Sequence, residues 1–532
     1  MRQGYLIQSR PLRTGAVVTA LAFLVQVLAP SAALAHHFTL PGGTSPSVTT
    51  DPNSGQGPTN NPSDRDPNVR AKTDPIDVHL GDFILTRQDV FLPVGRGPSV
   101  DITFSYRSRS AYNGHFGYGW DMSYNKRVRK LANNNLVVMR GANRKDEFVF
   151  TAPSAYTAPA GIYDTLVQNV DGTYTLASKH GDKEFYDVNG NLVRLEDRNG
   201  NALTFTYDAA GLLPITGKSA YFVNQTTGVI AREYRLTTMT DTIGRTVNFT
   251  YTAEGRVATI AYEGRTIGYA YDSTGTGDLV SVTMPATPDF PSGTTTRYAY
   301  DLQHNITTIT DAKNQMYLTN IYDAATDRVT SQTYGTGTSS IVYGTDASSN
   351  KTSEVTDRKG FRTLFTFDAA GHITRQEEFT DGNPPGEPLS YVTTYEYNAA
   401  GERTRVVFPR GNATEFTYDA KGNVLEIRRK KIGIPKGQSD PSDLVTTFTY
   451  ESSFSFIKTA TDPRGNTTTY SYDYDLGEPK KGNVRKITFP AVSGQTIEAA
   501  FTYTSFGQLD AVTDPNNNMT KYVYDAATGY LA

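Results

Sequence analysis

The stretch Glu415–Ile427, with the sequence EFTYDAKGNVLEI, sets the architecture of this 532-residue chain. Phe416 and Tyr418 alternate with a threonine, which is the two-residue period of one face of a pleated strand. After the intervening residues Asp419–Val424, Leu425 and Ile427 resume the alternation. The stretch therefore predicts a strand, a tight turn and a return strand.

The turn of this unit is predicted from two residues, Asp419 and Gly422. An aspartate at the first position of a type I turn accepts hydrogen bonds from the backbone ahead of it. A glycine three residues later takes the left-handed conformation at little cost. Asp419 and Gly422 are therefore interpreted as turn residues, and Tyr418 as a packing residue.

The same unit recurs to the end of the chain. Tyr or Phe followed by Asp, or a close variant, stands at positions 186, 207, 251, 271, 300, 322, 367, 397, 418, 450, 472, 503 and 524. Many neighbouring copies are 20–22 residues apart, and longer gaps indicate inserted loops or degenerate copies. The structural repeat motif is assigned to Tyr186, Asp187, Gly190, Tyr207, Asp208, Gly211, Tyr271, Asp272, Tyr418, Asp419, Gly422, Tyr472, Asp473, Tyr524 and Asp525.

A second aspartate-initiated turn lies between successive motifs, as in Asp197-Arg-Asn-Gly-Asn201 and Asp462-Pro-Arg-Gly-Asn466. In each of these two copies the turn aspartate precedes the next motif tyrosine by 10 residues. Two strands and two turns in a period of about 20 residues predict stacked β-hairpins that bury their faces against their neighbours. The predicted fold is all-β, with stacked antiparallel hairpins in a spiralling sheet, preceded by a small β-domain.

Composition narrows the functional classes. With 51 basic and 54 acidic residues the formal net charge is −3, which gives no global case for nucleic-acid binding. The chain contains no cysteine, which excludes disulfides, thiol catalysis, cysteine zinc sites and iron–sulfur clusters. No cofactor is predicted.

The N-terminus predicts export. Residues 1–35 combine a basic start, an apolar core over Ala16–Ala29 and small residues before a cleavage site after Ala35. An uncleaved anchor is the alternative, although 14 apolar residues are short for a membrane span. Residues 36–74 predict a disordered linker rich in Pro, Gly, Ser and Asn. The expected location is secreted or cell-surface, without a further membrane span.

Three further regions are predicted: an N-terminal β-domain over 75–150, connecting hairpins over 151–185, and repeats over 186–532. In the first, Tyr112–Trp120 is interpreted as a buried aromatic cluster, with a sugar-binding platform as the alternative. The alternating Lys and Arg residues of Tyr124–Lys130 predict the solvent face of a strand.

The motif resembles the YD repeat of the rearrangement-hot-spot (RHS) family. The units Tyr186–Leu192, YDVNGNL, and Tyr418–Leu425, YDAKGNVL, carry the resemblance. The sequence before the repeats is similar to the N-terminal domain that often precedes them in exported bacterial proteins. The segments that carry this similarity are Pro75-Ile-Asp-Val-His-Leu-Gly-Asp-Phe83 and Gly117-Tyr-Gly-Trp120. The resemblance covers residues 75–532.

The resemblance implies a continuous β-strip that spirals into a hollow shell, commonly around a C-terminal domain that is frequently a toxin. Related shells occur in insecticidal toxin complexes and in animal teneurins. The Asp-Pro-x-Gly-rich segment that ends such shells is not found, since Asp462-Pro-Arg-Gly465 falls in phase with the repeat turns. Toxin identity and self-cleavage thus gain no support from the motifs.

Catalytic motifs are missing from the sequence: there is no His-Glu-x-x-His, phosphate loop, Gly-x-Ser-x-Gly elbow or Rossmann fingerprint. The seven scattered histidines predict surface or packing roles. Most aspartates repeat at turn positions, which favours turn capping over catalysis. Asp473–Asp475 and Asp514–Asn518 offer oxygen ligands, with calcium as a weaker alternative to turn formation.

The leading hypothesis is an exported, non-enzymatic RHS shell protein, or a fragment of one, that encapsulates or presents a C-terminal domain. The chain stops one turn into a new repeat, at Tyr524–Ala532, so we expect the partner to be a downstream polypeptide. The alternative is a cell-surface adhesin or carbohydrate-binding protein with envelope glycans as partners. A polysaccharide-processing enzyme is the weakest hypothesis. No nucleic-acid partner is predicted.

Overall fold

The computed structural model describes residues 76–532, except for 132, 153–154, 215–231 and 382–384. The predicted signal peptide and linker, residues 1–74, lie outside the described residues. The described chain consists of strands and turns, with one short 3-10 helix among them, η3 (Asp473–Leu476). The predicted all-β fold is confirmed. None of the described helices is long and apolar enough to cross a membrane.

Two small sheets form the N-terminal part. A three-stranded antiparallel sheet has the order β1-β2-β5, and β3 pairs with β4. The strands are β1 (Ile84–Leu92), β2 (Val100–Arg107), β3 (Asn113–Gly114), β4 (Gly117–Tyr118) and β5 (Trp120–Met122). A tight N-terminal hairpin, Ile76–Phe83, precedes β1 and is held by a bridge between its two end residues.

All the following strands belong to one antiparallel sheet in which each strand pairs with the next along the chain. Its first strands are β6 (Lys126–Lys130), β7 (Leu136–Gly141), β8 (Arg144–Ala152), β9 (Ala155–Thr157), β10 (Thr165–Gln168), β11 (Tyr174–Ala177), β12 (Lys183–Tyr186) and β13 (Leu192–Glu196). The next are β14 (Ala202–Pro214), β15 (Arg232–Thr240), β16 (Thr246–Tyr251), β17 (Val257–Tyr262), β18 (Arg265–Tyr271), β19 (Leu279–Thr283), β20 (Thr295–Tyr300), β21 (Ile306–Thr310), β22 (Met316–Tyr322), β23 (Val329–Tyr334), β24 (Gly337–Thr345), β25 (Lys351–Thr356), β26 (Arg362–Phe367) and β27 (Ile373–Phe379). The last are β28 (Ser390–Tyr397), β29 (Arg403–Val407), β30 (Ala413–Tyr418), β31 (Val424–Lys430), β32 (Leu444–Tyr450), β33 (Ile457–Thr461), β34 (Thr467–Tyr472), β35 (Val484–Val492), β36 (Gln495–Tyr503), β37 (Leu509–Thr513) and β38 (Met519–Lys521).

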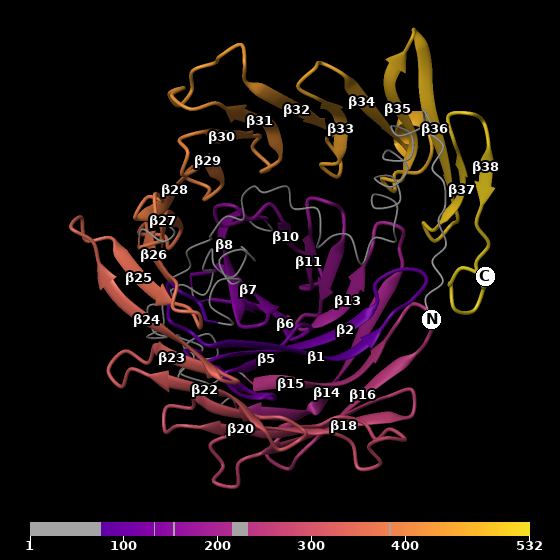
Figure 1. The fold of residues 1–532 in the computed structure, drawn as a ribbon. Helices are drawn as coiled ribbons and strands as arrows, with labels where there is room; N and C mark the ends of the chain where they lie inside the picture. The colour runs from indigo at the N-terminus through magenta and orange to yellow at the C-terminus, as the bar shows by residue number, and fades with distance from the viewer. Residues whose placement is uncertain (1–75, 132, 153–154, 215–231, 382–384) are drawn as a thin grey trace, which may run out of the picture.

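The long sheet winds back on itself. Arg127 in β6 bridges Asn191 in the β12–β13 turn, and the Val128 N–H donates to the Gly190 carbonyl at 2.8 Å. In Figure 1 the strands from β14 to β38 follow one another around a ring, while β6, β7, β8, β10 and β11 occupy its middle. The sheet thus forms an inner coil, β6–β13, followed by a wider outer coil, β14–β38.

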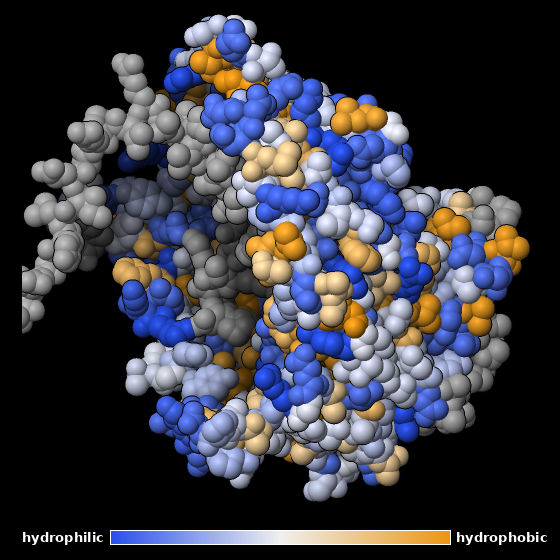
Figure 2. Space-filling model, turned by 90° about the vertical axis from the view of Figure 1, so that its right-hand side faces the viewer, coloured by the Kyte–Doolittle hydropathy of each residue, from blue (hydrophilic) through white to orange (hydrophobic). Residues whose placement is uncertain are grey.

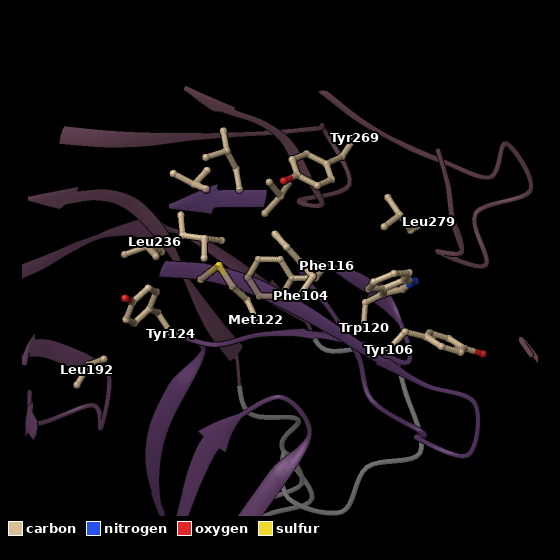
Figure 3. Close-up of a cluster of buried hydrophobic side chains, with 14 of the residues drawn as sticks. Phe104, Tyr106, Phe116, Trp120, Met122, Tyr124, Leu192, Leu236, Tyr269 and Leu279 are labelled. Carbon is tan, nitrogen blue, oxygen red and sulfur yellow. The ribbon is translucent and has the colours of Figure 1, made fainter. Parts of the chain in front are cut away.

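The main core lies between the N-terminal sheet and the inner face of the outer coil. Phe104 and Tyr106 on β2 and Trp120 on β5 are at most 1 % exposed. They point towards side chains of the coil such as Tyr269 and Leu279 (Figure 3). The same β1, β2 and β5 strands run inside the lower half of the ring in Figure 1. The N-terminal sheet therefore lines part of the shell from within.

The outer face of the sheet is polar. Threonine pairs such as Thr449–Thr459 and ion pairs such as Lys486–Glu498 join neighbouring strands there. Figure 2 shows one side of the molecule, where hydrophobic residues lie singly or in small groups among hydrophilic ones. The sheet is amphipathic because alternate residues of each strand point to opposite faces.

The predicted region boundaries fall inside this continuous sheet. Strand β8 spans the boundary at 150/151, and the ladder runs unbroken through β12 at 185/186. The prediction of a solvent-exposed strand at Lys126–Lys130 is wrong for Arg127, which is 3 % exposed. Strand β6 is the innermost strand of the winding, so one of its basic residues is enclosed by the turn after β12.

Candidate functional site

The repeat unit is built around a saturated aspartate. In the turn after β30, Asp419 Oδ1 accepts the backbone N–H groups of Lys421 and Asn423 at 2.8 and 2.9 Å. Its Oδ2 accepts the Asn423 side-chain amide at 2.9 Å, and Gly422 has φ 68°. The carboxylate thereby accepts hydrogen bonds from the backbone donors of the turn. Asp419 therefore has a structural role as a turn-capping residue.

A β-bulge accompanies the turn and changes which residue faces the core. Tyr418 pairs with Val424, while its neighbour Thr417 pairs with Glu426, so Leu425 is the extra residue. Val424 is consequently buried at 6 % exposure and Leu425 is exposed at 37 %. The predicted alternation through Leu425 is therefore wrong, because the bulge shifts the return strand by one position.

The motif tyrosine links neighbouring strands through its hydroxyl. Tyr418 Oη donates to the carbonyl of Arg403, the first residue of β29, at 2.7 Å. Nine further copies make the same contact at 2.7–3.1 Å: Tyr251–Leu236, Tyr271–Val257, Tyr300–Leu279, Tyr322–Ile306, Tyr343–Val329, Tyr397–Ile373, Tyr450–Val424, Tyr472–Ile457 and Tyr524–Leu509. Most of these acceptors are the first residue of a return strand. That residue lies next to the β-bulge, and its carbonyl accepts the tyrosine hydroxyl.

This hydroxyl contact was missed by the sequence-based interpretation, which treated the tyrosine as a packing residue only. The signal was the preference for Tyr over Phe at the motif position. Burial raises the pKa of Tyr300 and Tyr322 well above the ordinary value. These hydroxyls are therefore donors, with no role as a base near neutral pH.

The remaining predicted motif residues vary around the same scheme. Asp187 and Gly190 form the tight turn, but Tyr186 Oη donates to Glu184 instead of a backbone carbonyl. Asp272 and Asp525 close longer turns, and Asp473 begins η3 with its carboxylate accepting backbone N–H groups. The turn predicted at Asp208 and Gly211 is absent from the structure: β14 continues through both residues to Pro214.

The lined wall, defined here as the inner face of β14–β27, meets the N-terminal sheet at a buried polar cluster. Arg87 on β1 pairs with Asp89, with Nε 2.5 Å from Oδ1, and donates to Tyr298 Oη at 2.6 Å. Tyr269 Oη donates to Asp89 Oδ2 at 2.5 Å. The guanidinium also lies 5.5 Å from the ring centroid of Trp120. Both members of the Arg87–Asp89 ion pair thus have hydrogen-bond partners where the two sheets meet. Such partners are needed to offset the loss of solvation when an ion pair is buried.

The Tyr112–Trp120 stretch is a buried aromatic cluster, as predicted. Tyr112, Phe116 and Trp120 are at most 5 % exposed. Trp120 Nε1 donates to Tyr300 Oη at 3.0 Å, and Tyr118 stacks on His304 with ring centroids 3.9 Å apart. The cluster is thus part of the contact between the N-terminal sheets and the lined wall, here called the N-terminal joint.

A cavity of about 260 Å³ lies against the inner coil, where its lining includes the ends of β12 and β13 and the loop before β2. Lys126 and Tyr186 both hold the Glu184 carboxylate, and Arg140 pairs with Asp164 at 2.7 Å. Burial alone raises the pKa of Glu184, but the adjacent Lys126 and Arg140 lower it below the ordinary value. Two of the three basic residues that line the cavity, Lys126 and Arg140, are therefore paired with carboxylates of the same cavity.

Turns of the inner coil dock against turns of the outer coil. The Arg198 guanidinium lies 4.4 Å from the Phe456 ring centroid and donates to the Gly482 carbonyl at 3.0 Å. Lys179 Nζ donates to the Lys421 carbonyl at 3.0 Å. These contacts, here called the coil seam, hold the winding by side chains rather than by a strand ladder.

The open wall, defined as the inner face of β28–β37, carries the same apolar pattern with less cover. Tyr395, Phe448 and Tyr470 are half-buried, whereas Phe365 at the equivalent position of β26 is 1 % exposed. Cover is uneven within the open wall, since Phe416 and Phe501 at the same repeat position are 6 % and 2 % exposed. Among the described residues, the main core has no buried member from β28 to β37. A small separate cluster forms at β35 and β36 instead. Part of the concave apolar face thus lacks a lining sheet.

Candidate ligand sites are few in the described part of the chain. No group of three or more His, Asp or Glu side chains there is placed to hold a metal ion. The Asp473 carboxylate, considered for calcium, accepts backbone N–H groups from Tyr474 and Gly482. The arrangement of side chains is suited to holding the sheet together.

Comparison with protein families matches three regions of the chain. Residues 73–148 match a domain of unknown function (DUF6531), residues 186–219 and 290–315 match the RHS repeat, and residues 318–529 match the teneurin YD-shell. The matches cover the N-terminal sheets, the beginning of the long sheet and most of the outer coil.

Two curated relatives are bacterial. Double-stranded DNA deaminase toxin A of Burkholderia cenocepacia (strain H111) is 27 % identical over 172 residues, which are 32 % of this chain and 10 % of the relative. The tRNA nuclease WapA of Bacillus subtilis (strain 168) is 24 % identical over 128 residues, or 24 % and 5 % of the two chains. The aligned parts thus span a tenth or less of these relatives.

Among solved structures, the crystal structure of TcdB2-TccC3 aligns with a TM-score of 0.45 and 14 % identity, covering 87 % of this chain and 23 % of that one. The Photorhabdus luminescens Tc holotoxin pore aligns with a TM-score of 0.43 and 13 % identity, covering 84 % and 27 %.

Proposed function

The chain is an RHS/YD-repeat protein, and on that premise we propose that it forms part of an exported β-shell that encloses or presents a C-terminal polypeptide domain. The open wall is the observation that carries the proposal. At three of its strands, β28, β32 and β34, it offers half-buried aromatic side chains on a concave face, whereas Phe365 and its equivalents in the lined wall belong to the main core. Apolar surface of this kind gains free energy when another polypeptide covers it.

The class of cargo is proposed to be a toxin, since two relatives with matching segments are named as a deaminase toxin and a tRNA nuclease. Hydrogen bonding of the motif aspartate and tyrosine within the sheet, as at Asp419 and Tyr418, supports a structural role for these residues. We therefore propose a structural, non-enzymatic role for the repeats. Export is proposed from the signal-like residues 1–35.

The test is site-specific photo-crosslinking from the two faces of one strand. Benzoylphenylalanine at Tyr470 faces the concave side, and the same label at its neighbour Thr469 faces the outside. In protein isolated from its native cells, we expect position 470 alone to cross-link to polypeptide that is protected from protease. Equal labelling from both positions, or only peptides of residues 76–532 cross-linked to each other at both positions, contradicts enclosure.

Glycan binding, the alternative from the sequence, receives no support from a specific observation. The motif tyrosines have their hydroxyls on backbone carbonyls, and the Tyr112–Trp120 aromatics are buried. A glycan partner remains a prediction.

A further inference from the structure

Histidines are concentrated where the N-terminal part contacts the outer coil. His79 on the N-terminal hairpin lies with its ring centroid 4.9 Å from that of Phe367 in the outer coil. His115 Nδ1 is 2.8 Å from the Gly255 carbonyl, and His304 stacks on Tyr118. Three of the five histidines in the described chain therefore lie in this one joint.

His79 is the member of this group that the N-terminal hairpin carries. Its side chain is buried, and its Nδ1 makes no hydrogen bond in the described structure. The ring faces the Phe367 ring and the backbone of Gly371, where a side chain at Gly371 would meet the imidazole at 2.8 Å. A protonated imidazole has two N–H groups that need acceptors, and Nδ1 has none in this packing.

Charged groups around His79 come from each element packed on it and are balanced in sign. They are Asp77 on its own hairpin, Asp368 in the β26–β27 turn, Lys351 at the start of β25 and Arg328 before β23. Asp77 already accepts the His79 and Leu80 N–H groups at 2.9 and 3.0 Å and lies 3.6 Å from Arg107. Burial, opposed by Asp77 and reinforced by the two cations, lowers the pKa of His79 to about 4.

The hairpin that carries His79 is also hydrogen-bonded to the wall through its backbone. Gly81 accepts from the Val329 N–H at 2.9 Å, and Val78 accepts from Ser353 Oγ at 2.5 Å. We propose that the N-terminal hairpin is a pH-sensitive latch, which holds the N-terminal sheet against the lined wall while His79 is neutral and detaches when His79 is protonated.

The direction of the pH effect follows from the linkage between protonation of His79 and docking of the hairpin. The pKa of His79 is lower when the hairpin is docked than when it is free, so docking is complete above the free value of 6.5 and weakens as the pH falls towards 4. Between pH 7 and pH 5 the equilibrium for hairpin opening should rise roughly twenty-fold. His304 lies in a different setting, with its Nδ1 3.0 Å from the Asp278 carboxylate.

The experiment measures hydrogen exchange of the whole chain at pH 7 and pH 5, corrected for the intrinsic pH dependence of exchange. We expect residues 76–83 and the Val329 amide to lose protection by ten-fold or more at pH 5, reversibly, while β29–β37 keep theirs. The His79→Gln and His79→Phe variants should abolish this difference, and His304→Gln should retain it. Unchanged protection of 76–83 in the wild type, or an undiminished response in both His79 variants, overturns the proposal.

Discussion

The lined wall and the open wall are made from one repeat in one phase, but they bury it to different extents. Phe365 and Phe448 both stand two residues before the motif position, and both point to the concave side. Phe365 is 1 % exposed because the N-terminal part packs in front of it, whereas Phe448 is half-buried. The repeat thus specifies an apolar inner face, and another segment decides whether that face is a core or a surface.

The first prediction tests this difference directly. Phe365→Ala should destabilise its strands by about 3–5 kcal/mol, since it removes a fully buried ring. Phe448→Ala, the matched variant, should cost roughly half as much because part of its ring already contacts solvent. Native-state hydrogen exchange of β25–β27 and β31–β33 measures both losses. Equal losses would show that the open wall is covered as completely as the lined one.

The second prediction compares an ion pair between the N-terminal sheet and the lined wall with an ion pair on the outer face of the long sheet. Asp89→Ala should cost about 3 kcal/mol, because it leaves the Arg87 guanidinium buried between the N-terminal sheet and the lined wall. Glu498→Ala removes the partner of Lys486, whose side chain is 38 % exposed, and should cost less than about 1 kcal/mol. Chemical denaturation followed by the emission of Trp120, the single tryptophan, reports the first loss. A small effect of Asp89→Ala would mean that water reaches the joint.

The third prediction concerns the coil seam. A Cβ at Gly422 would lie 2.3 Å from the Tyr163 ring, and the residue has φ 68°. Gly422→Ala should therefore cost about 2 kcal/mol or more and loosen the seam. Gly465 has φ 83° with open space around it, so Gly465→Ala should cost only about 1 kcal/mol. Proteolysis of the loop around Tyr163 distinguishes the two, and similar cleavage in both variants would contradict docking of this turn.

The smallest predicted effect belongs to the motif hydroxyl. Tyr418→Phe removes the donor to the Arg403 carbonyl and should cost about 1 kcal/mol. Tyr300→Phe should cost more, about 1–3 kcal/mol, because Tyr300 Oη also accepts from the buried Trp120 indole. Thermal unfolding of the two variants ranks them. A larger loss of stability in Tyr418→Phe than in Tyr300→Phe would show that the hydrogen bond between Trp120 and Tyr300 does not stabilise the protein.

Sequence reasoning succeeded where local chemistry is decisive. Asp419 and Gly422 determine their turn within five residues, so the turn is visible in the sequence. It failed at Gly211, where β14 extends past the motif with an irregular register against β15 between Asp208 and Leu213, and at Leu425, because a bulge is a property of a strand pair. The acceptor of Tyr418 Oη was invisible for the same reason, as it belongs to the preceding strand.

By itself, the sequence determined the repeat, its two turns, the antiparallel all-β class and the apolar inner face, since each depends on residues close together in the chain. Only the tertiary structure decided that the segment before the repeats lies inside the winding, that Arg198 and Lys179 join one coil to the other, and that His79 is buried against the wall. These contacts connect residues hundreds of positions apart. The curvature of the sheet determines which distant residues meet, and a local sequence pattern does not determine that curvature.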